Sequence, residues 1–437
     1  MPTNRDVWRI AAPMILSNVS VPLLGMVDTG VVGHLESPVY LGAVAIGATI
    51  FGFLYTGMNF LRMGTTGIAA QRYGADDYDG LRVSLGQALI VAQLIAITLL
   101  VLQAPLGRLA LDLVGAEPDV ESFAREYFSI RIWSAPGTLA NYALIGWFLG
   151  LQNARVPLLI FLTINVTNIV LDLIFVLGFG MKVDGVALAS VIAEYAALLV
   201  ALAFAARELK KRAGHWPLAR LLRVRAYGAF FSVNANLFVR TLALMFTFFF
   251  ITAQGARLGG LVLAANAVLM NFVNLTSFAL DGFAHAAEAL VGKAVGQRNR
   301  RSLEESVRLC LKWSLYFAAG ISIAYLVAGQ FLLELLTDLP DVRSTTMSYL
   351  PWVVISPLIA VWSFLYDGVY VGATRAREMR DIMLVSTFVV FLPAWYLLQG
   401  FGNHGLWAAF VLFFASRGIG MHVGYRRRLL PSVGGSE

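Results

Sequence analysis

The sequence predicts an all-α integral membrane protein whose twelve transmembrane helices form two six-helix lobes. Three observations support this fold class. First, 58% of the 437 residues are hydrophobic and only 14% are charged, a composition that requires a lipid environment. Second, the apolar residues form runs long enough to cross about 30 Å of hydrocarbon. Third, the second half of the sequence resembles the first at a fixed offset.

The apolar runs define the expected helices. Backbone groups in lipid must be hydrogen-bonded internally, and long runs without period-2 alternation predict helices rather than a barrel. The first run is longer than a signal-peptide core and no A-x-A site follows it, so we expect it to be a retained span. The predicted spans are 10–33, 39–61, 83–107, 132–154, 156–181, 185–206, 226–256, 258–280, 309–333, 344–366, 382–403 and 405–425.

Lys and Arg residues gather on one side of these spans. The basic segment 207–225 is the longest polar stretch, and it divides the chain into an expected N-lobe, 1–206, and an expected C-lobe, 226–437. Because positive charge is retained in the cytoplasm, we expect both termini to be cytoplasmic and the protein to span the cell inner (plasma) membrane several times. The net charge of +7 then follows from topology, and no nucleic-acid partner is implied.

An internal repeat relates the two expected lobes. The separation between Gly33 and Gly255 defines the repeat offset, and the same offset aligns G-L-Q-N-A-R at 150–155 with G-A-T-R-A-R at 372–377. Each copy contains six spans, an even number, so the copies share one orientation. They are expected to be related by a pseudo-twofold axis along the membrane normal, with a cavity between them, as in transporters.

Two acidic residues mark a candidate ion site in the N-lobe. A charged side chain inside a span costs about 2.5–3.5 kcal/mol, so Asp28 and Asp172 are functional candidates. Because an α-helix has a fixed rise per residue, both can be placed in the outer half of their spans, as can Ser190. Asn165, Asn168 and Asp172 share one helical face. These oxygens predict a Na⁺ site or a proton site, and hydrogen bonding between helices is the structural alternative.

Other charged residues are candidates for accessory roles. Glu194 is expected either in the transport path or paired with an arginine. Arg240 is more often a structural counter-charge, and Asp367 lies near a cytoplasmic span end, where snorkelling and loop contacts are the simpler explanation. His285 and Glu288 share a face without a third ligand, so we expect no metal site there, and no cofactor.

Five segments in order cover essentially the whole chain. They are P-L-L-G-M-V-D-T-G-V-V-G-H-L (22–35), M-G-T-T-G-I-A-A-Q-R-Y-G (63–74), N-I-V-L-D-L-I-F (168–175), D-G-V-A-L-A-S (184–190) and D-G-V-Y-V-G-A-T-R-A-R-E-M-R (367–380). Together they resemble the multidrug and toxic compound extrusion (MATE) family, specifically its DinF branch. The resemblance implies two rocking six-helix lobes that export amphipathic or cationic small molecules in exchange for H⁺ or Na⁺.

The resemblance also implies a cation or proton site in the first lobe. It falls on Asp28, Asn168 and Asp172, with Ser190 at a position where relatives can carry Thr. The hydroxyl group is kept, so this departure changes little.

Two further features of the family are compared with this sequence. A bend of the first helix would fall near Pro13, and Pro22 is also available. Asp367 aligns with an acidic site of the NorM branch. However, span 226–256 offers Arg240 rather than an acidic partner, so that site is not carried over.

Three functions remain open at this point. In the first, protonation or Na⁺ binding at Asp28 and Asp172 favours the state of a monomeric antiporter that releases its substrate outward. A flippase for a lipid-linked precursor is the second, and a large basic cleft would favour it. The third is an intramembrane aspartyl protease using the same two residues, although Asp172 lies in V-L-D-L, without a Gly-x-Gly-Asp context.

Overall fold

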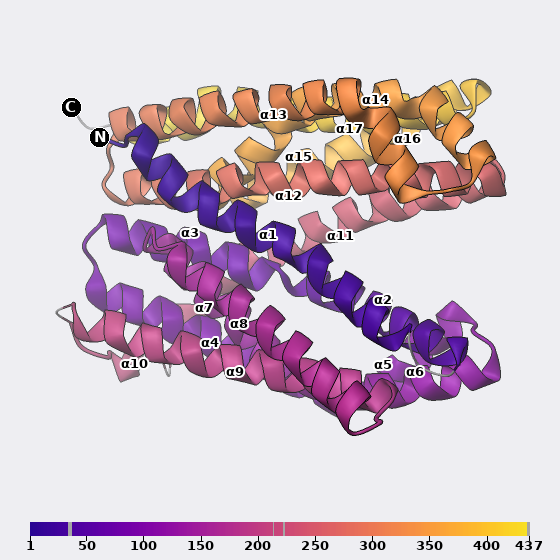
Figure 1. Ribbon diagram of the computed structural model, residues 1–437. Helices are drawn as coiled ribbons and strands as arrows, with labels where there is room; N and C mark the ends of the chain where they lie inside the picture. Colours follow the sequence, from indigo (N-terminus) through magenta and orange to yellow (C-terminus); the bar gives the residue numbers. More distant parts are fainter. Residues whose placement is uncertain (34–36, 213, 222, 435–437) are drawn as a thin grey trace. The chain divides into compact units, whose positions relative to one another are not determined.

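The computed structural model describes residues 1–33, 37–212, 214–221 and 223–434. The side chains of residues 21–24, 26, 28, 29, 32 and 218 also lie outside the description. These parts of the chain are helices and connecting segments, without a strand (Figure 1). Ten of the described helices are long and apolar enough to cross a membrane. The predicted all-α membrane fold class is confirmed.

The helices of the structure overlap the predicted spans. The α-helices are α1 Asn4–Val32, α2 Pro38–Met58, α3 Phe60–Gly74, α4 Tyr78–Val101, α5 Gln103–Val114, α6 Pro118–Arg131, α7 Ala135–Gly150, α8 Arg155–Asp172, α9 Val183–Lys210, α10 Leu218–Leu221, α11 Gly228–Arg257, α12 Gly260–Gly296, α13 Arg300–Leu336, α14 Pro340–Gly372, α15 Ala376–Leu384, α16 Leu392–Leu398, α17 Asn403–Gly424 and α18 Leu430–Ser432. Short 3-10 or π-helical segments are η1 Ile132–Ser134, η2 Leu173–Gly178, η3 Val224–Tyr227, η4 Val385–Phe391, η5 Gln399–Phe401 and η6 Tyr425–Leu429.

Ten of the predicted spans coincide with helices that qualify as membrane-spanning. The other two, 10–33 and 132–154, lie on α1 and on η1 with α7. The total of twelve spans therefore stays a prediction. Several helices are longer than predicted: α12 continues from the expected end at residue 280 to Gly296, so the segment that carries Asp281, His285, Glu288 and Lys293 is helical as well.

Contacts divide the chain into two compact units. The first unit consists of Leu16–Phe230, and the second unit combines Met1–Ile15 with Phe231–Glu437. The helix α1 thus begins in the second unit and continues in the first, and the change falls shortly after Pro13. Pro22 also lies within α1, and its side chain is outside the described residues. The lobe boundaries and the hinge positions stay predictions.

Close helix packing holds each unit together. In the first unit α3 packs against α7 and α4, and α8 packs against α9; in the second, α12 packs against α14 and α13 (Figure 1). Glycines permit the closest approaches, because a Cβ atom at Gly146 would overlap the carbonyl oxygen of Arg62. In the same way, a Cβ atom at Gly368 would overlap the carbonyl oxygen of Ala284.

The internal repeat is visible in local backbone geometry. The two glycines just described are counterparts at the repeat offset, and so are the two residues whose carbonyl oxygens they approach. Left-handed residues recur at the same offset, in the pairs Asp76 and Arg298, Gln152 and Thr374, and Gly180 and Gly402. Non-glycine residues rarely adopt positive φ, so such matches are informative. The predicted repeat is confirmed at the level of its turns and helix contacts.

Helix caps follow the repeat too. The side chain of Asp77 accepts a hydrogen bond from the backbone nitrogen of Gly80 at the start of α4. That of Asn299, its counterpart at the repeat offset, accepts one from Ser302 at the start of α13. Both residues satisfy backbone N–H groups that a helix start leaves without partners.

Candidate functional site

The predicted ion site lies on one face of α8 in the first unit. Asn165, Asn168 and Asp172 are spaced i, i+3, i+7, and the structure buries all three, with 0% of Asp172 exposed. The α-helix ends at Asp172 and continues as the π-helical segment η2. Such segments widen a helix locally and are frequent at functional sites. The buried carboxyl group therefore stands where the helix geometry changes.

Two side-chain hydrogen bonds connect this face to neighbouring helices. The Asn168 Nδ2 atom donates to Ser190 Oγ on α9 at 3.0 Å. The Asn165 Nδ2 atom donates to Ser20 Oγ on α1 at 2.8 Å. The structure thus brings Asn168 and Ser190 together as predicted. Ser20 is a further residue of this region that was not predicted. Its sequence signal is its position on the same predicted helix as Asp28, about two helical turns earlier.

The side chain of Asp28 lies outside the described residues. Its backbone is part of α1, the helix that contributes Ser20 to the same region. The pairing of Asp28 with Asp172 therefore stays a prediction.

Glu194 belongs to a second polar group in the first unit. Its Oε2 atom and its carbonyl oxygen accept hydrogen bonds from Asn141 Nδ2 on α7, at 2.9 and 3.0 Å. Arg131, at the end of α6, acts on the carboxylate electrostatically. Nearby, the hydroxyl groups of Tyr55 and Ser134 lie 2.7 Å apart. Glu194 is therefore held by an amide, with an arginine near it.

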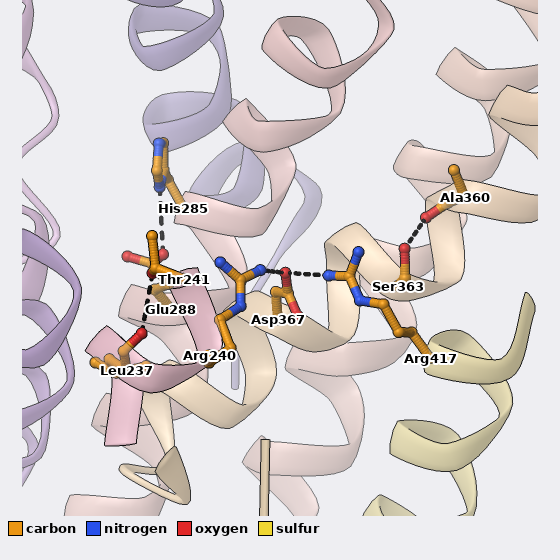
Figure 2. A network of polar contacts seen from close by, with 9 residues as sticks. All are labelled: Leu237, Arg240, Thr241, His285, Glu288, Ala360, Ser363, Asp367 and Arg417. Atoms are coloured by element: carbon orange, nitrogen blue, oxygen red, sulfur yellow. Dashed lines mark hydrogen bonds and ion pairs between the residues drawn. The ribbon is translucent and has the colours of Figure 1, made fainter. Parts of the chain in front are cut away.

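A buried ion network occupies the second unit (Figure 2). The Nη2 atoms of Arg240 on α11 and Arg417 on α17 both donate to Oδ2 of Asp367 on α14, the latter at 2.8 Å. Arg417 is 1% exposed and Asp367 is 8% exposed. Asp367 is therefore paired inside the helix bundle rather than snorkelling toward a loop, and Arg240 is its counter-charge.

Arg417 was missed in the sequence. It stands in F-V-L-F-F-A-S-R-G-I-G, within the predicted span 405–425. The rule that singled out Arg240, an ionisable side chain inside an apolar run, identifies it equally well.

His285 and Glu288 form a further buried contact on α12. The His285 Nδ1 atom lies 3.4 Å from Glu288 Oε1, with side chains 9% and 3% exposed. No group of three His, Cys, Asp or Glu side chains that could hold a metal ion occurs in the part of the chain that the structure describes.

Comparison with known proteins identifies the family. The MatE family model matches residues 13–174 and 237–397, which is most of the chain. The chain belongs to the MATE family of transporters. This MATE protein is 43% identical to the DNA damage-inducible protein F of Escherichia coli (strain K12), over 97% of this chain and 92% of that protein. That similarity confirms the predicted DinF branch.

More distant MATE relatives are similar over the same length. The probable multidrug resistance protein NorM of Bacillus subtilis (strain 168) is 24% identical, over 95% of this chain and 94% of the relative. A solved structure described as the outward-facing conformation of a multidrug resistance MATE family transporter matches with a TM-score of 0.86. It is 20% identical and covers 99% of this chain and 97% of its own, so it supports the fold.

Membership of the MATE family settles one of the open alternatives. MATE proteins are transporters and not enzymes, so the aspartyl protease interpretation is excluded. In this MATE protein, the repeat places Val390 and Ala394 at the positions of Asn168 and Asp172. Ala394 packs against the hydrophobic core of the second unit. The two copies therefore share a fold and differ in chemistry at these positions.

Proposed function

We propose that this protein exports amphipathic or cationic small molecules across the cell inner membrane in exchange for H⁺ or Na⁺. The observation that carries the proposal is the buried polar face of α8, where Asp172 lies beside an amide hydrogen-bonded to Ser190. A buried carboxylate is costly unless a proton, a cation or a hydrogen-bond donor compensates it. Family membership supports transport, and the relatives named for multidrug resistance support the substrate class.

Coupling would require a site that binds its ion differently in two states. A cation shifts a conformational equilibrium only by its differential affinity for the two conformations. We assign the ion to Asp28, Asn168, Asp172 and Ser190, because α1, α8 and α9 all contribute to this region. Movement of α1 would alter the site directly, and Pro13 is the hinge that we favour. Two solved MATE structures with TM-scores of 0.87 and 0.85 are described as bent and straight conformations.

The direction of transport rests on topology. The basic segment 207–225 and the basic tail support cytoplasmic termini by the positive-inside rule. The predicted coupling residues then lie in the outer half of the membrane, where an ion enters from outside.

Efflux from proteoliposomes tests the proposal. The purified full-length protein is reconstituted, and release of cationic dyes is measured with a pH gradient or a Na⁺ gradient imposed separately. We expect one gradient to drive efflux and Asp28→Asn or Asp172→Asn to reduce that efflux at least about tenfold, which corresponds to about 1.4 kcal/mol. Asp112→Asn, a substitution of an exposed aspartate on α5, is the control.

Two results would contradict the proposal. If Asp172→Asn exports dye at the wild-type rate under both gradients, then the ion site does not lie on α8. If the rate of dye efflux does not depend on either gradient, then transport is not coupled to H⁺ or Na⁺, and the protein acts as a flippase or a uniporter.

A further inference from the structure

We propose that a basic cavity in the second unit binds a phosphate group, either on the headgroup of an anionic phospholipid or as free phosphate. The cavity has a volume of about 610 Å³ and lies between the turn after α12, the turn after α14 and the segment around α18. Its polar lining comes from Arg298, Arg375 and Ser432, and its apolar lining includes Val295, Leu429 and Val433. The site is separate from the ion site on α8, and it does not depend on coupled transport.

The two arginines of the cavity supply the donors. The Arg375 Nη2 atom donates to Ser432 Oγ at 2.8 Å, and its Nη1 atom lies 3.3 Å from Glu378 Oε1. The side chain of Arg298 is exposed and forms no hydrogen bond or ion pair within the part of the chain that the structure describes. A guanidinium group has five N–H donors, so both arginines keep donors for a ligand. Planar guanidinium groups match phosphate oxygens in geometry and charge.

Contacts between the three segments form the cavity in advance of any ligand. The Arg375–Ser432 hydrogen bond joins the turn after α14 to α18, and Ser432 Oγ donates to the carbonyl oxygen of Leu429 at 2.6 Å. Gly434 has a φ of +88°, and a Cβ atom there would lie 3.3 Å from the Cβ atom of Arg300. The last described residues therefore pack on the start of α13. Such preorganisation lowers the entropic cost of binding.

The internal repeat shows that these turns do not require arginine. Arg298 has a φ of +53°, and Asp76, its counterpart at the repeat offset, has a φ of +54°. The counterpart of Arg375 is Asn153, and the backbone nitrogens of both donate to the carbonyl oxygen five residues earlier. The first unit thus forms the same turns with an acid and an amide. Aspartate and asparagine are also more usual than arginine at positive φ, so the backbone does not account for Arg298.

The surroundings of the cavity are positively charged. The segments 292–308, 373–381 and 422–434 contain eleven Lys and Arg residues and four Asp and Glu residues. Each of the four carboxylates is paired with an arginine of the same segment. The excess charge is therefore positive, and a field of this sign attracts anions.

The position of the cavity favours a lipid as the source of the phosphate. The helix α14 has 33 residues, which corresponds to a length of about 50 Å. A bilayer is about 40–45 Å thick when its polar headgroups are included, so the end of α14 reaches the headgroup region. By the positive-inside rule this basic end is expected in the cytoplasm, and basic pockets on that side of a membrane suit anionic headgroups. The apolar lining would contact the lipid beside its phosphate.

Two binding measurements on the full-length, detergent-purified protein separate the two sources. Native mass spectrometry measures binding of phosphatidylglycerol, with diacylglycerol as a reference that lacks the phosphate. A scintillation proximity assay measures binding of radiolabelled inorganic phosphate. We expect phosphatidylglycerol to bind in preference to diacylglycerol. Lipid binding without phosphate binding identifies a headgroup site, whereas saturable phosphate binding that phosphatidylglycerol displaces identifies a site that also accepts free phosphate.

Matched substitutions distinguish the cavity from a general attraction to positive charge. Arg298→Gln and Arg375→Gln each remove one donor group from the cavity and should weaken binding at least about tenfold. The controls are Arg301→Gln and Arg377→Gln, which remove the same charge from exposed arginines outside the lining. Their affinities should stay within about twofold of the wild type, because single exposed charges contribute little. Arg298 has no partner to lose, so Arg298→Gln keeps the test available if Arg375→Gln fails to fold.

Three results would overturn the proposal. The first is that neither phosphatidylglycerol nor inorganic phosphate binds to the wild-type protein. The second is that Arg298→Gln binds with wild-type affinity. The third is an equal loss of affinity in all four variants, which would show that the basic residues act only through their summed charge. Because both assays measure binding alone, their outcome is independent of the efflux experiment.

Discussion

Replacing Asp367 by asparagine removes the centre of the ion network in the second unit. Its Oδ2 atom accepts hydrogen bonds from both Arg240 and Arg417, and all three residues are at most 8% exposed. In Asp367→Asn, two guanidinium groups that cannot lose their charge face a neutral amide. Breaking a buried ion pair by removing one partner costs about 3–5 kcal/mol, and here two pairs are lost together. We therefore expect a loss of stability toward the upper end of that range.

The expected shift in unfolding temperature follows from this energy. In a domain of about 150–250 residues, about 1 kcal/mol shifts Tm by about 2–4 °C. A loss of about 3–5 kcal/mol thus lowers Tm by roughly 6–20 °C. The assay is thermal denaturation of the detergent-purified protein, followed by fluorescence-detected size exclusion after heating.

Two controls make the result specific. Arg240→Met leaves one arginine for one carboxylate, so this variant should lose less stability than Asp367→Asn. Asp381→Asn disrupts an exposed pair with Arg380, and exposed pairs contribute about 0–1 kcal/mol. If Asp367→Asn melts within about 2 °C of the wild type, the network is not a stabilising one and the reasoning fails.

Three other predictions concern helix packing and the candidate site. Gly368→Ala places a methyl group on the backbone of α12 and should destabilise by about 1–3 kcal/mol in thermal denaturation, whereas Gly320→Ala, in open space on α13, should be neutral or stabilising. Ser190→Ala removes the acceptor of the Asn168 hydrogen bond and should lower gradient-driven efflux, while Ser190→Thr retains the acceptor. Equal efflux rates in the two variants would show that transport does not need the hydroxyl group. Asn266→Ala leaves the buried amide of Asn403 without the two hydrogen bonds that join these side chains and should cost about 1–3 kcal/mol, measured as a lower unfolding midpoint; an unchanged midpoint would contradict this.

Helix existence and much of the candidate site followed from local sequence. Long runs of apolar residues without period-2 alternation specify helices in lipid, because helices and closed barrels are the structures that satisfy the backbone there and barrel strands alternate. The i, i+3, i+7 spacing of Asn165, Asn168 and Asp172 placed them on one face, since a helix has a fixed period. The repeat was readable because turns with left-handed residues, such as Gln152 and Thr374, recur at a constant offset. Burial of Asp172 was predictable from the cost of exposing a charge to lipid.

Helix partners required the tertiary structure. Nothing in the local pattern around Asn165 indicates that its amide meets Ser20, which lies on a helix far away in the sequence. The same holds for Arg240 and Arg417, which converge on Asp367 from two other helices. The sequence by itself determined which segments are helices, which faces are polar and that the chain is duplicated, because these depend on composition and period. Only the tertiary structure decided which polar groups compensate one another, because side-chain pairing depends on how separate helices pack.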